Sequence, residues 1–289
     1  VPHEEKSTPK RGFELLAESL RFYLEQKIKE VSPKWQPILF SIILGQSQKM
    51  EQSDIKMFKN LGVFHLFVIS GLHVSFFASL ILLLYQIPFR FLYLCGVLTV
   101  KQWMYVGNVA RVGAVLSLYV FALAIGFPHS AQRAFLVFFL SQVLTLLSVR
   151  WDAKDRVLMV LSGHMICFPV GFLCIPNLLS WLSYLVILVF SKRGTLVQML
   201  CCQILLFLIV GAFLGCFSVS GIFVNLLLVP LFPVVLCSSV LMMFKSILPD
   251  FLVFFATTAI ESFLLISETL FHRFSITTTL FWDTRDWIF

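Results

Sequence analysis

The stretch "HLFVISGLHVS", residues 65 to 75, places polar groups inside a long apolar run. Ser70 is a preferred N-cap residue and Gly71 accepts a change of backbone direction, so we predict a helix break there and a new helix after it. Such a helix start presents free N–H groups and partial positive charge, which suits phosphates and other anions. His73 falls in its first turn. His65 lies about 80° away around an ideal helix, which is wrong for a two-histidine metal site. A packed kink with hydrogen-bonded histidines is the alternative.

A second polar group interrupts "AIGFPHSAQRAFLVFF". Gly126 and Pro128 predict a break between two helices, and Arg133 follows a short step into the second one. An arginine at that place either extends to the membrane interface or faces a wet cavity, where it attracts anions.

A third interruption is "FSVSGIFVNLLLVPLFP", in which Gly221, Pro230 and Pro233 are candidates for helix breaks. Asn225 adds an amide that needs a partner in lipid, and plain packing is the alternative to a functional role. Glu261 and Glu268 lie further on in an apolar segment. We favour a surface position for these acids, with proton coupling as the alternative.

The elements that must position these groups are membrane helices. Of the 289 residues, 59% are hydrophobic and only 13% are charged, and the mean hydropathy is +0.92, which excludes an ordinary soluble domain. We predict an all-α polytopic transmembrane bundle with broken or re-entrant helices and an N-terminal amphipathic helix. Eight hydrophobic segments are expected at 63–86, 110–127, 131–149, 156–176, 178–191, 195–217, 221–246 and 250–271.

The expected organisation has three parts. Residues 1–35 form a polar, amphipathic interfacial segment, residues 36–271 form the membrane domain, and residues 272–289 form a polar tail. A short apolar helix at "QPILFSIILG" is either interfacial or partly inserted. The stretch "FRFLYLCGVLTVKQWMYVGN" is assigned to the interface or to a half-helix, because its apolar run stops at Lys101.

Loop cations indicate the orientation. One side carries nine, Arg90, Lys101, Arg111, Arg150, Lys154, Arg156, Lys192, Arg193 and Lys245, and the other carries six, Lys49, Lys56, Lys59, Arg133, Arg273 and Arg285. We expect the richer side to be cytoplasmic and both termini to be extracytoplasmic. The net charge of +7 by itself does not imply nucleic acid.

Several chemistries have no visible motif. The chain contains no G-x-x-x-x-G-K-[ST] phosphate loop, no H-E-x-x-H and no H-x-H-x-D pattern. The seven cysteines show no metal-binding spacing. We therefore expect no metal, no cofactor, no catalytic residue and no nucleotide hydrolysis by this chain.

The motifs resemble a known family. "HLFVISGLHV" is similar to the H-L-x-A-I-S-G-L-H-V signature of the ComEC-type competence domain, "IGFPHSAQRA" looks like its G-F-x-x-S-x-x-R-A hairpin, and "NLLLVPLFP" matches its N-L-L-x-x-P-L landmark. The segment "VLMVLSGHMICFPVGFLCIPNLLSWLSY" departs from the family pattern. The OB-like and metallo-β-lactamase-like domains of longer members are not found in this chain.

The resemblance implies a multi-pass channel in the bacterial plasma (inner) membrane that passes single-stranded DNA inward during natural transformation, without catalysis. Implied partners are a cytoplasmic motor ATPase or DNA-binding protein and a DNA receptor on the outer side. Phosphates cannot cross hydrocarbon unpaired, so a hydrated path is needed. Its candidate residues are His65, Ser70, Gly71, His73, Arg133 and Asn225.

Two other functions stay open. A secondary permease for a small organic anion uses broken helices and midplane polar groups equally well. An intramembrane serine hydrolase would need Ser70 within hydrogen-bond reach of a base such as His73 or His164, together with an oxyanion hole.

Overall fold

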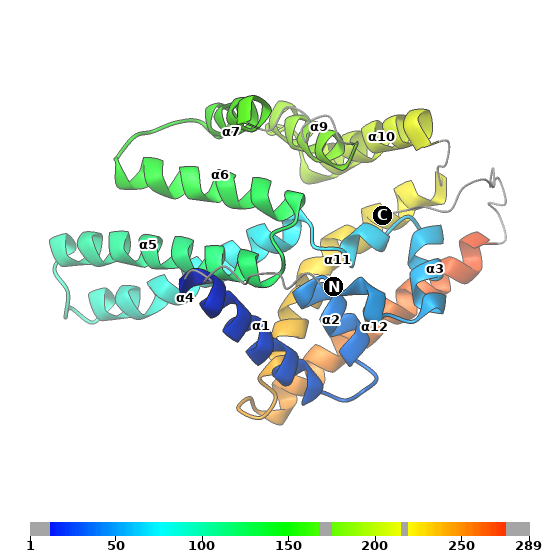
Figure 1. The fold of residues 1–289 in the computed structure, drawn as a ribbon, viewed down its shortest axis with the longest axis horizontal. Helices are drawn as coiled ribbons and strands as arrows, with labels where there is room; N and C mark the ends of the chain where they lie inside the picture. Colours follow the sequence, from blue (N-terminus) through cyan, green and yellow to red (C-terminus); the bar gives the residue numbers. More distant parts are fainter. Residues whose placement is uncertain (1–11, 168–174, 215–218, 276–289) are drawn as a thin grey trace, which may run out of the picture. The chain divides into compact units, whose positions relative to one another are not determined.

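The computed structural model describes residues 12–167, 175–214 and 219–275 (Figure 1). The fold is all-α, as predicted, with no strand in these residues. The helices group into two units, and each unit combines segments that are distant in the sequence. Unit 1 contains residues 12–30 and Ile69–Asp152, and unit 2 contains Val31–Val68 and the chain from Ala153 onward. The division between the units falls inside the stretch 65–75.

Unit 1 consists of α1 (Gly12–Lys29), α4 (Gly71–Leu94), α5 (Val100–Ala124) and α6 (His129–Leu146). Helices α4 and α5 form a hairpin, visible in Figure 1, in which the rings of Phe77 and Phe121 lie 4.6 Å apart. The Tyr85 hydroxyl lies 3.0 Å from the Ser117 hydroxyl across the same contact. The predicted amphipathic helix is α1, which packs on α5 through an edge contact between Phe13 and Tyr119.

The stretch after the first predicted segment differs from expectation. It is not a separate interfacial element, because α4 continues through Pro88 to Leu94 and α5 already begins at Val100. The reason is local, since Thr99 and Gln102 form a capping box that starts α5 before the apolar run becomes continuous. Arg111, expected in a loop, consequently lies in the middle of α5.

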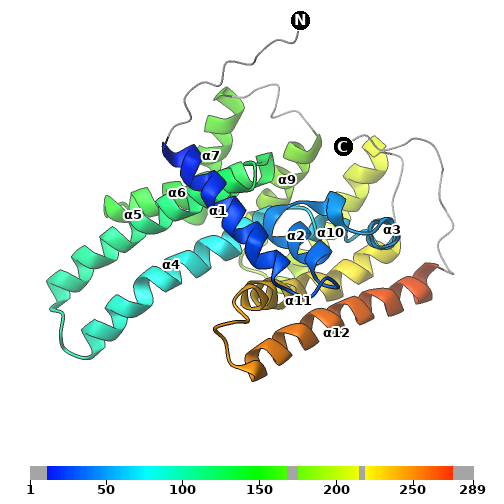
Figure 2. The ribbon, with the colours of Figure 1, turned by 60° about the horizontal axis from the view of Figure 1, so that its bottom comes forward.

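Unit 2 consists of α2 (Gln36–Leu44), η1 (Ser47–Lys49), α3 (Gln52–Asn60), η2 (Phe64–Leu66), α7 (Ala153–Cys167), α9 (Ile175–Val189), α10 (Thr195–Leu214), α11 (Val219–Met243) and α12 (Asp250–Ser275). Helices α11 and α12 lie side by side (Figure 2). The short helix α2 packs against α11, and all of its residues from Ile38 to Leu44 are buried. It is therefore part of the core of this unit.

Four phenylalanines that are at most 2% exposed form the centre of unit 2. The ring of Phe67 lies 4.1 Å from that of Phe58, 6.3 Å from that of Phe232 and 6.3 Å from that of Phe263. These residues come from α3, the segment after η2, α11 and α12. Aromatic pairs at such distances add to the energy of burial, so this cluster fixes the segment before Ser70 against three helices.

The predicted breaks at Gly221, Pro230 and Pro233 are wrong. Gly221 lies in the first turn of α11, and the helix continues through both prolines to Met243. Each proline removes one N–H from the helical ladder, but Pro230 is exposed and Pro233 is half-buried on a flank of the helix, away from the packed core. Transmembrane helices tolerate proline when neighbouring groups satisfy the freed carbonyls. Gly126 and Pro128 do lie at a break, the turn between α5 and α6.

Four helical segments of the described chain are long and apolar enough to cross a membrane: Phe64–Leu94, Val100–Ala124, Gly221–Met243 and Asp250–Arg273. The predicted segments at 131–149, 156–176, 178–191 and 195–217 correspond to α6, α7, α9 and α10. The number of crossings and the orientation stay predictions, as do the domain boundaries at 35 and 271.

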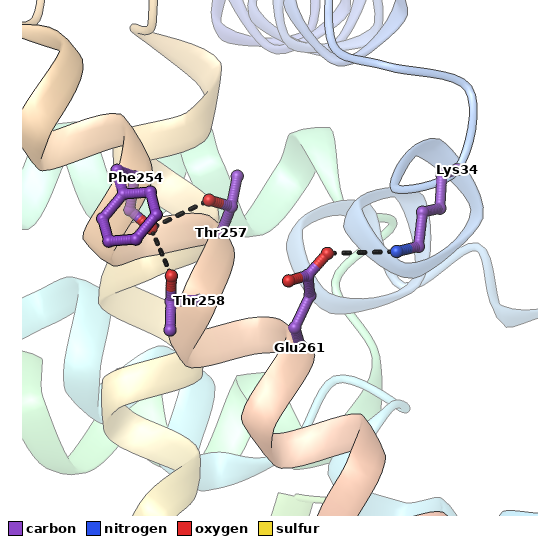
Figure 3. Close-up of polar contacts among 5 residues, drawn as sticks. All are labelled: Lys34, Phe254, Thr257, Thr258 and Glu261. Carbon is purple, nitrogen blue, oxygen red and sulfur yellow. Dashed lines mark hydrogen bonds and ion pairs between the residues drawn. The ribbon is translucent and has the colours of Figure 1, made fainter.

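One carboxylate lies halfway along the last of these spans. Glu261 of α12 accepts a hydrogen bond from Lys34 Nζ at 3.0 Å, as Figure 3 shows. One turn earlier, the hydroxyls of Thr257 and Thr258 both donate to the carbonyl of Phe254 at 2.8 Å. The Lys34 ammonium also lies 4.4 Å from the ring centre of Trp35. The acid is thus paired with a cation from the segment before α2, which reduces the cost of a charge at this position.

Candidate functional site around a broken helix

The stretch 65–75 is broken where the sequence predicts. The chain makes one turn of 3₁₀ helix, Phe64–Leu66, then leaves helical geometry, and α4 begins at Gly71 with Ser70 as its N-cap. Irregular backbone at membrane depth is stable only where other groups satisfy its carbonyls and N–H groups. The partners of these backbone groups therefore define the site, and they come from each unit separately.

In unit 1 the helix start is capped from within. The backbone N–H of Ser70 donates to Nδ1 of His73 at 3.2 Å, and the Ser70 hydroxyl lies 2.9 Å from the same nitrogen. The two residues form a capping box in which histidine takes the place of the usual Glu or Gln. His73 is only 1% exposed. Its role as a cap explains the three-residue spacing between serine and histidine.

The start of α6 supports the same place. The Ser130 hydroxyl donates to the carbonyl of Ile69 at 2.6 Å. A Cβ added to Gly71 would lie 3.9 Å from the Cβ of Ala134, which is ordinary contact. Arg133 is 4% exposed, which is against the alternative that it extends to a surface. The first two predicted landmarks are therefore neighbours in unit 1.

In unit 2 the preceding turn is held by α11. Gly62 has a left-handed φ of +72°, and a Cβ there would lie 3.4 Å from the Cα of Gly221. One turn along α11, Asn225 Nδ2 donates to the Gly62 carbonyl at 3.4 Å and to Gln203 Oε1 at 3.2 Å. Asn225 is 5% exposed. The third predicted landmark therefore holds the turn that leads into the first.

His65 lies close to this turn. Its side chain is exposed, and its imidazole interacts with the backbone of Gly62. His65 and Asn225 thus meet at one glycine in unit 2, whereas Ser70, Gly71 and His73 meet in unit 1 with the start of α6. The six predicted residues form two clusters on the two sides of the Val68–Ile69 bond.

Sequence reasoning missed three polar residues of these clusters. The Ser41 hydroxyl, which is fully buried, donates to the carbonyl of Phe67 at 2.7 Å, and Gln203 pairs with Asn225. Ser130 could have been found, because it is the serine of the hairpin landmark. Nothing in the local pattern around Ser41 or Gln203 distinguishes them from other polar residues in apolar helices.

Other predicted possibilities have structural explanations. His164 accepts a hydrogen bond from Trp181 Nε1 at 3.2 Å and is buried, as expected for a packing residue. Glu268 lies 3.9 Å from the imidazole of His272 on an exposed face of α12. Among the described residues, no group of three or more His, Cys, Asp or Glu side chains is placed to hold a metal ion.

These features define a class, the polytopic helical membrane proteins, with four described segments able to span a bilayer. A family model described as Competence protein matches residues 42–287. The chain therefore belongs to the competence protein family, and its role lies in competence and DNA uptake. No curated protein and no solved structure matches the chain.

Proposed function

We propose that the chain forms a passage for single-stranded DNA across the bacterial inner membrane and performs no catalysis itself. The observation that carries the proposal is the broken segment between Leu66 and Gly71, in which the carbonyl of Phe67 accepts from Ser41 and the carbonyl of Ile69 accepts from Ser130. A helix start within an apolar span offers N–H groups to phosphate without a fixed charge. Conduction needs such weak contacts, because a polyanion bound too tightly does not leave.

Arg133 supplies the charge in this proposal. It is one turn into α6, and the helix places Ser130 and Ala134 against the start of α4. Arginine remains protonated and binds phosphate through a planar fork of donors. Within unit 2, His65 and Asn225 are the candidate polar groups. The driving force comes from a cytoplasmic motor or DNA-binding partner, and a receptor on the outer side delivers the DNA.

Uptake of labelled DNA by cells carrying Arg133→Ala tests this proposal. We expect uptake to fall by at least tenfold, because one charge-assisted contact to phosphate is worth about 1.5–3 kcal/mol. Arg150→Ala is the matched control, since Arg150 is an exposed loop arginine. Membrane abundance of each variant is measured in parallel. Normal DNA uptake with loss of uptake of a small organic anion would instead favour the permease.

One contact favours a second candidate, the serine hydrolase. The 2.9 Å separation of the Ser70 hydroxyl and His73 Nδ1 meets the first requirement for a serine nucleophile and its base. The same nitrogen also accepts the Ser70 backbone N–H, and a neutral imidazole has one lone pair there. This sharing weakens His73 as a base. A fluorophosphonate probe that labels the wild-type chain but not Ser70→Ala would establish the hydrolase, and we expect no labelling.

A further inference from the structure

Arg111 lies halfway along the candidate span Val100–Ala124. Its side chain is half-buried, and its Nε is buried without a hydrogen-bond partner among the described residues. None of the carboxylates in the described part of the chain forms an ion pair with it. An intramembrane cation without a carboxylate partner is costly, so its position points to a bound anion or to water.

Gln142 of α6 has the complementary property. It is 8% exposed, and its Oε1 is buried without a hydrogen-bond partner in the described structure. A buried amide oxygen in this state costs about 1–3 kcal/mol unless a ligand or water satisfies it. The amide can also present its NH₂ group in the same place after a half-turn, because the two orientations are nearly isosteric.

The register of α5 and α6 brings these two side chains to the same level. The turn at 125–128 joins the helices, and the rings of Tyr119 and Phe135 lie 5.7 Å apart. Gln142 is two turns beyond Phe135 on the same face of α6, about 10 Å along the axis. Arg111 is eight residues before Tyr119, about 12 Å along α5 and about 80° around it. Both therefore lie at one depth of the hairpin.

This place is separate from the cluster around Ser70. Arg133 precedes Phe135 by two residues and lies about 200° around α6 from it, whereas Gln142 shares the face of Phe135. Arg133 thus lies on a different side of α6 from Gln142, the partner proposed for Arg111. Arg111 is not a second ligand of the site that contains Arg133.

We propose that Arg111 and Gln142 form a binding site for a phosphate group in the middle of the α5–α6 hairpin of unit 1. The guanidinium provides charge and donors, and the amide turns its NH₂ group toward the same oxygens. The assignment of that phosphate to the backbone of single-stranded DNA rests on the proposed function. A lipid headgroup and free phosphate present the same chemistry, and the experiment separates the three sources.

The test uses the full chain in nanodiscs of zwitterionic lipid and a fluorescent single-stranded oligothymidylate. For single strands, the logarithm of the binding constant falls with the logarithm of salt concentration with a slope of about −0.7 per phosphate contact. We expect Arg111→Gln to weaken binding by roughly tenfold at low salt and to reduce the slope by about 0.7. Arg150→Gln is the exposed control, and we expect it to leave the slope unchanged because Arg150 lies outside the proposed site.

A second variant, Gln142→Glu, distinguishes loss of the binding site from loss of folding. A carboxylate at this position pairs with Arg111 and occupies the site, so we expect thermal stability to be retained or raised while the salt slope falls as in Arg111→Gln. An unchanged slope in both variants overturns the proposal. The proposal also fails if Arg111→Gln only lowers thermal stability and Gln142→Glu binds DNA like the wild type.

The source of the phosphate is determined by competition. Inorganic phosphate or pyrophosphate raises the thermal stability of the wild type but not of Arg111→Gln if the site binds free phosphate. That result without binding of oligothymidylate supports the site and rejects its use for DNA. If Arg111→Gln and the wild type bind oligothymidylate equally in nanodiscs that contain phosphatidylglycerol, the lipid headgroup is the ligand, and the site is again supported. Loss of DNA uptake in Arg133→Ala with normal behaviour of Arg111→Gln retains the proposed function and rejects this site.

Discussion

The two halves of the stretch 62–73 are stabilised in different ways. After the Val68–Ile69 bond, the helix start is capped by a residue three positions away, the Ser70–His73 pair. Before it, the Gly62 turn depends on Asn225, which is 163 residues further along the chain. The two serine contacts do not follow this difference in sequence distance, because Ser130 is 61 residues from Ile69 and Ser41 is 26 residues from Phe67; they differ in burial, the first partly buried and the second buried.

The difference shows which part of a broken span is locally encoded. A cap within one turn forms as soon as the helix forms, because both partners are in the same segment. A turn held by a distant amide forms only when two helices have already packed. We therefore expect the unit 1 half to withstand loss of tertiary contacts better than the unit 2 half.

The largest effect is expected from removal of the local cap. His73→Ala removes a side chain that is 1% exposed and breaks the capping box, at a cost of about 3 kcal/mol in the free energy of unfolding. Unfolding in mixed detergent micelles measures the loss, and hydrogen exchange locates it. Faster exchange in the first turn of α4 with unchanged exchange around Gly62 is the expected pattern, and equal effects on both would contradict a cap that forms independently of the Gly62 turn.

Removal of the distant amide has the next largest effect. Asn225→Leu removes the amide donor to the Gly62 carbonyl and to Gln203 Oε1, which costs about 2 kcal/mol. A double-mutant cycle with Gln203→Leu measures their coupling, and we expect about 1 kcal/mol, typical of polar pairs between membrane helices. A coupling near zero contradicts the geometry of the turn.

The Gly62 turn itself can be examined with a matched control. Gly62→Ala costs about 1–2 kcal/mol because of its left-handed φ, and the approach of Gly221 adds to this cost. Gly126 has a φ of +81° with nothing within 4 Å of an added Cβ, so Gly126→Ala bears the conformational cost alone. The same measurement in micelles gives both values, and the excess at Gly62 reports the contact with α11. Equal losses of stability in the two variants would show that the backbone at Gly221 shifts to accommodate the added Cβ at little cost.

The smallest effects concern the two serine hydroxyls. Ser41→Ala and Ser130→Ala each remove one hydrogen bond to the irregular backbone, worth about 1 kcal/mol. Ser41 is fully buried and Ser130 is half-buried, so water replaces the lost bond more easily at Ser130. We expect the larger loss for Ser41→Ala, and the reverse order would mean that the Ser130 contact lies away from water.

The sequence predicts what depends on neighbouring residues. The break at Ser70, the position of His73 in the first turn and the turn at Gly126 all follow from short-range preferences. The predicted breaks at Pro230 and Pro233 fail because tertiary packing keeps α11 helical. The partnership of Asn225 with Gly62 could not be predicted, since it depends on which helices pack together.

The first residue of a helix cannot always be predicted from where an apolar run begins. Arg111 and Lys101 interrupt hydrophobicity and suggest a loop, yet the capping box at Thr99 makes this region the first part of α5. Whether a helix begins at a cap despite a charged residue inside it depends on the groups that surround that charge in the fold. The sequence could not predict that Arg111 Nε and Gln142 Oε1 are buried without a hydrogen-bond partner among the described residues, because this depends on how α5 and α6 pack.

The discontinuous composition of unit 2 has a consequence for biosynthesis. The Gly62 carbonyl is made 163 residues before its donor. At about 5–20 residues per second, a ribosome needs roughly 10–30 seconds to reach Asn225. During that interval the nascent segment with α2 and α3 has no α11 to pack against, so the Gly62 turn gains its amide donor only when synthesis has reached α11.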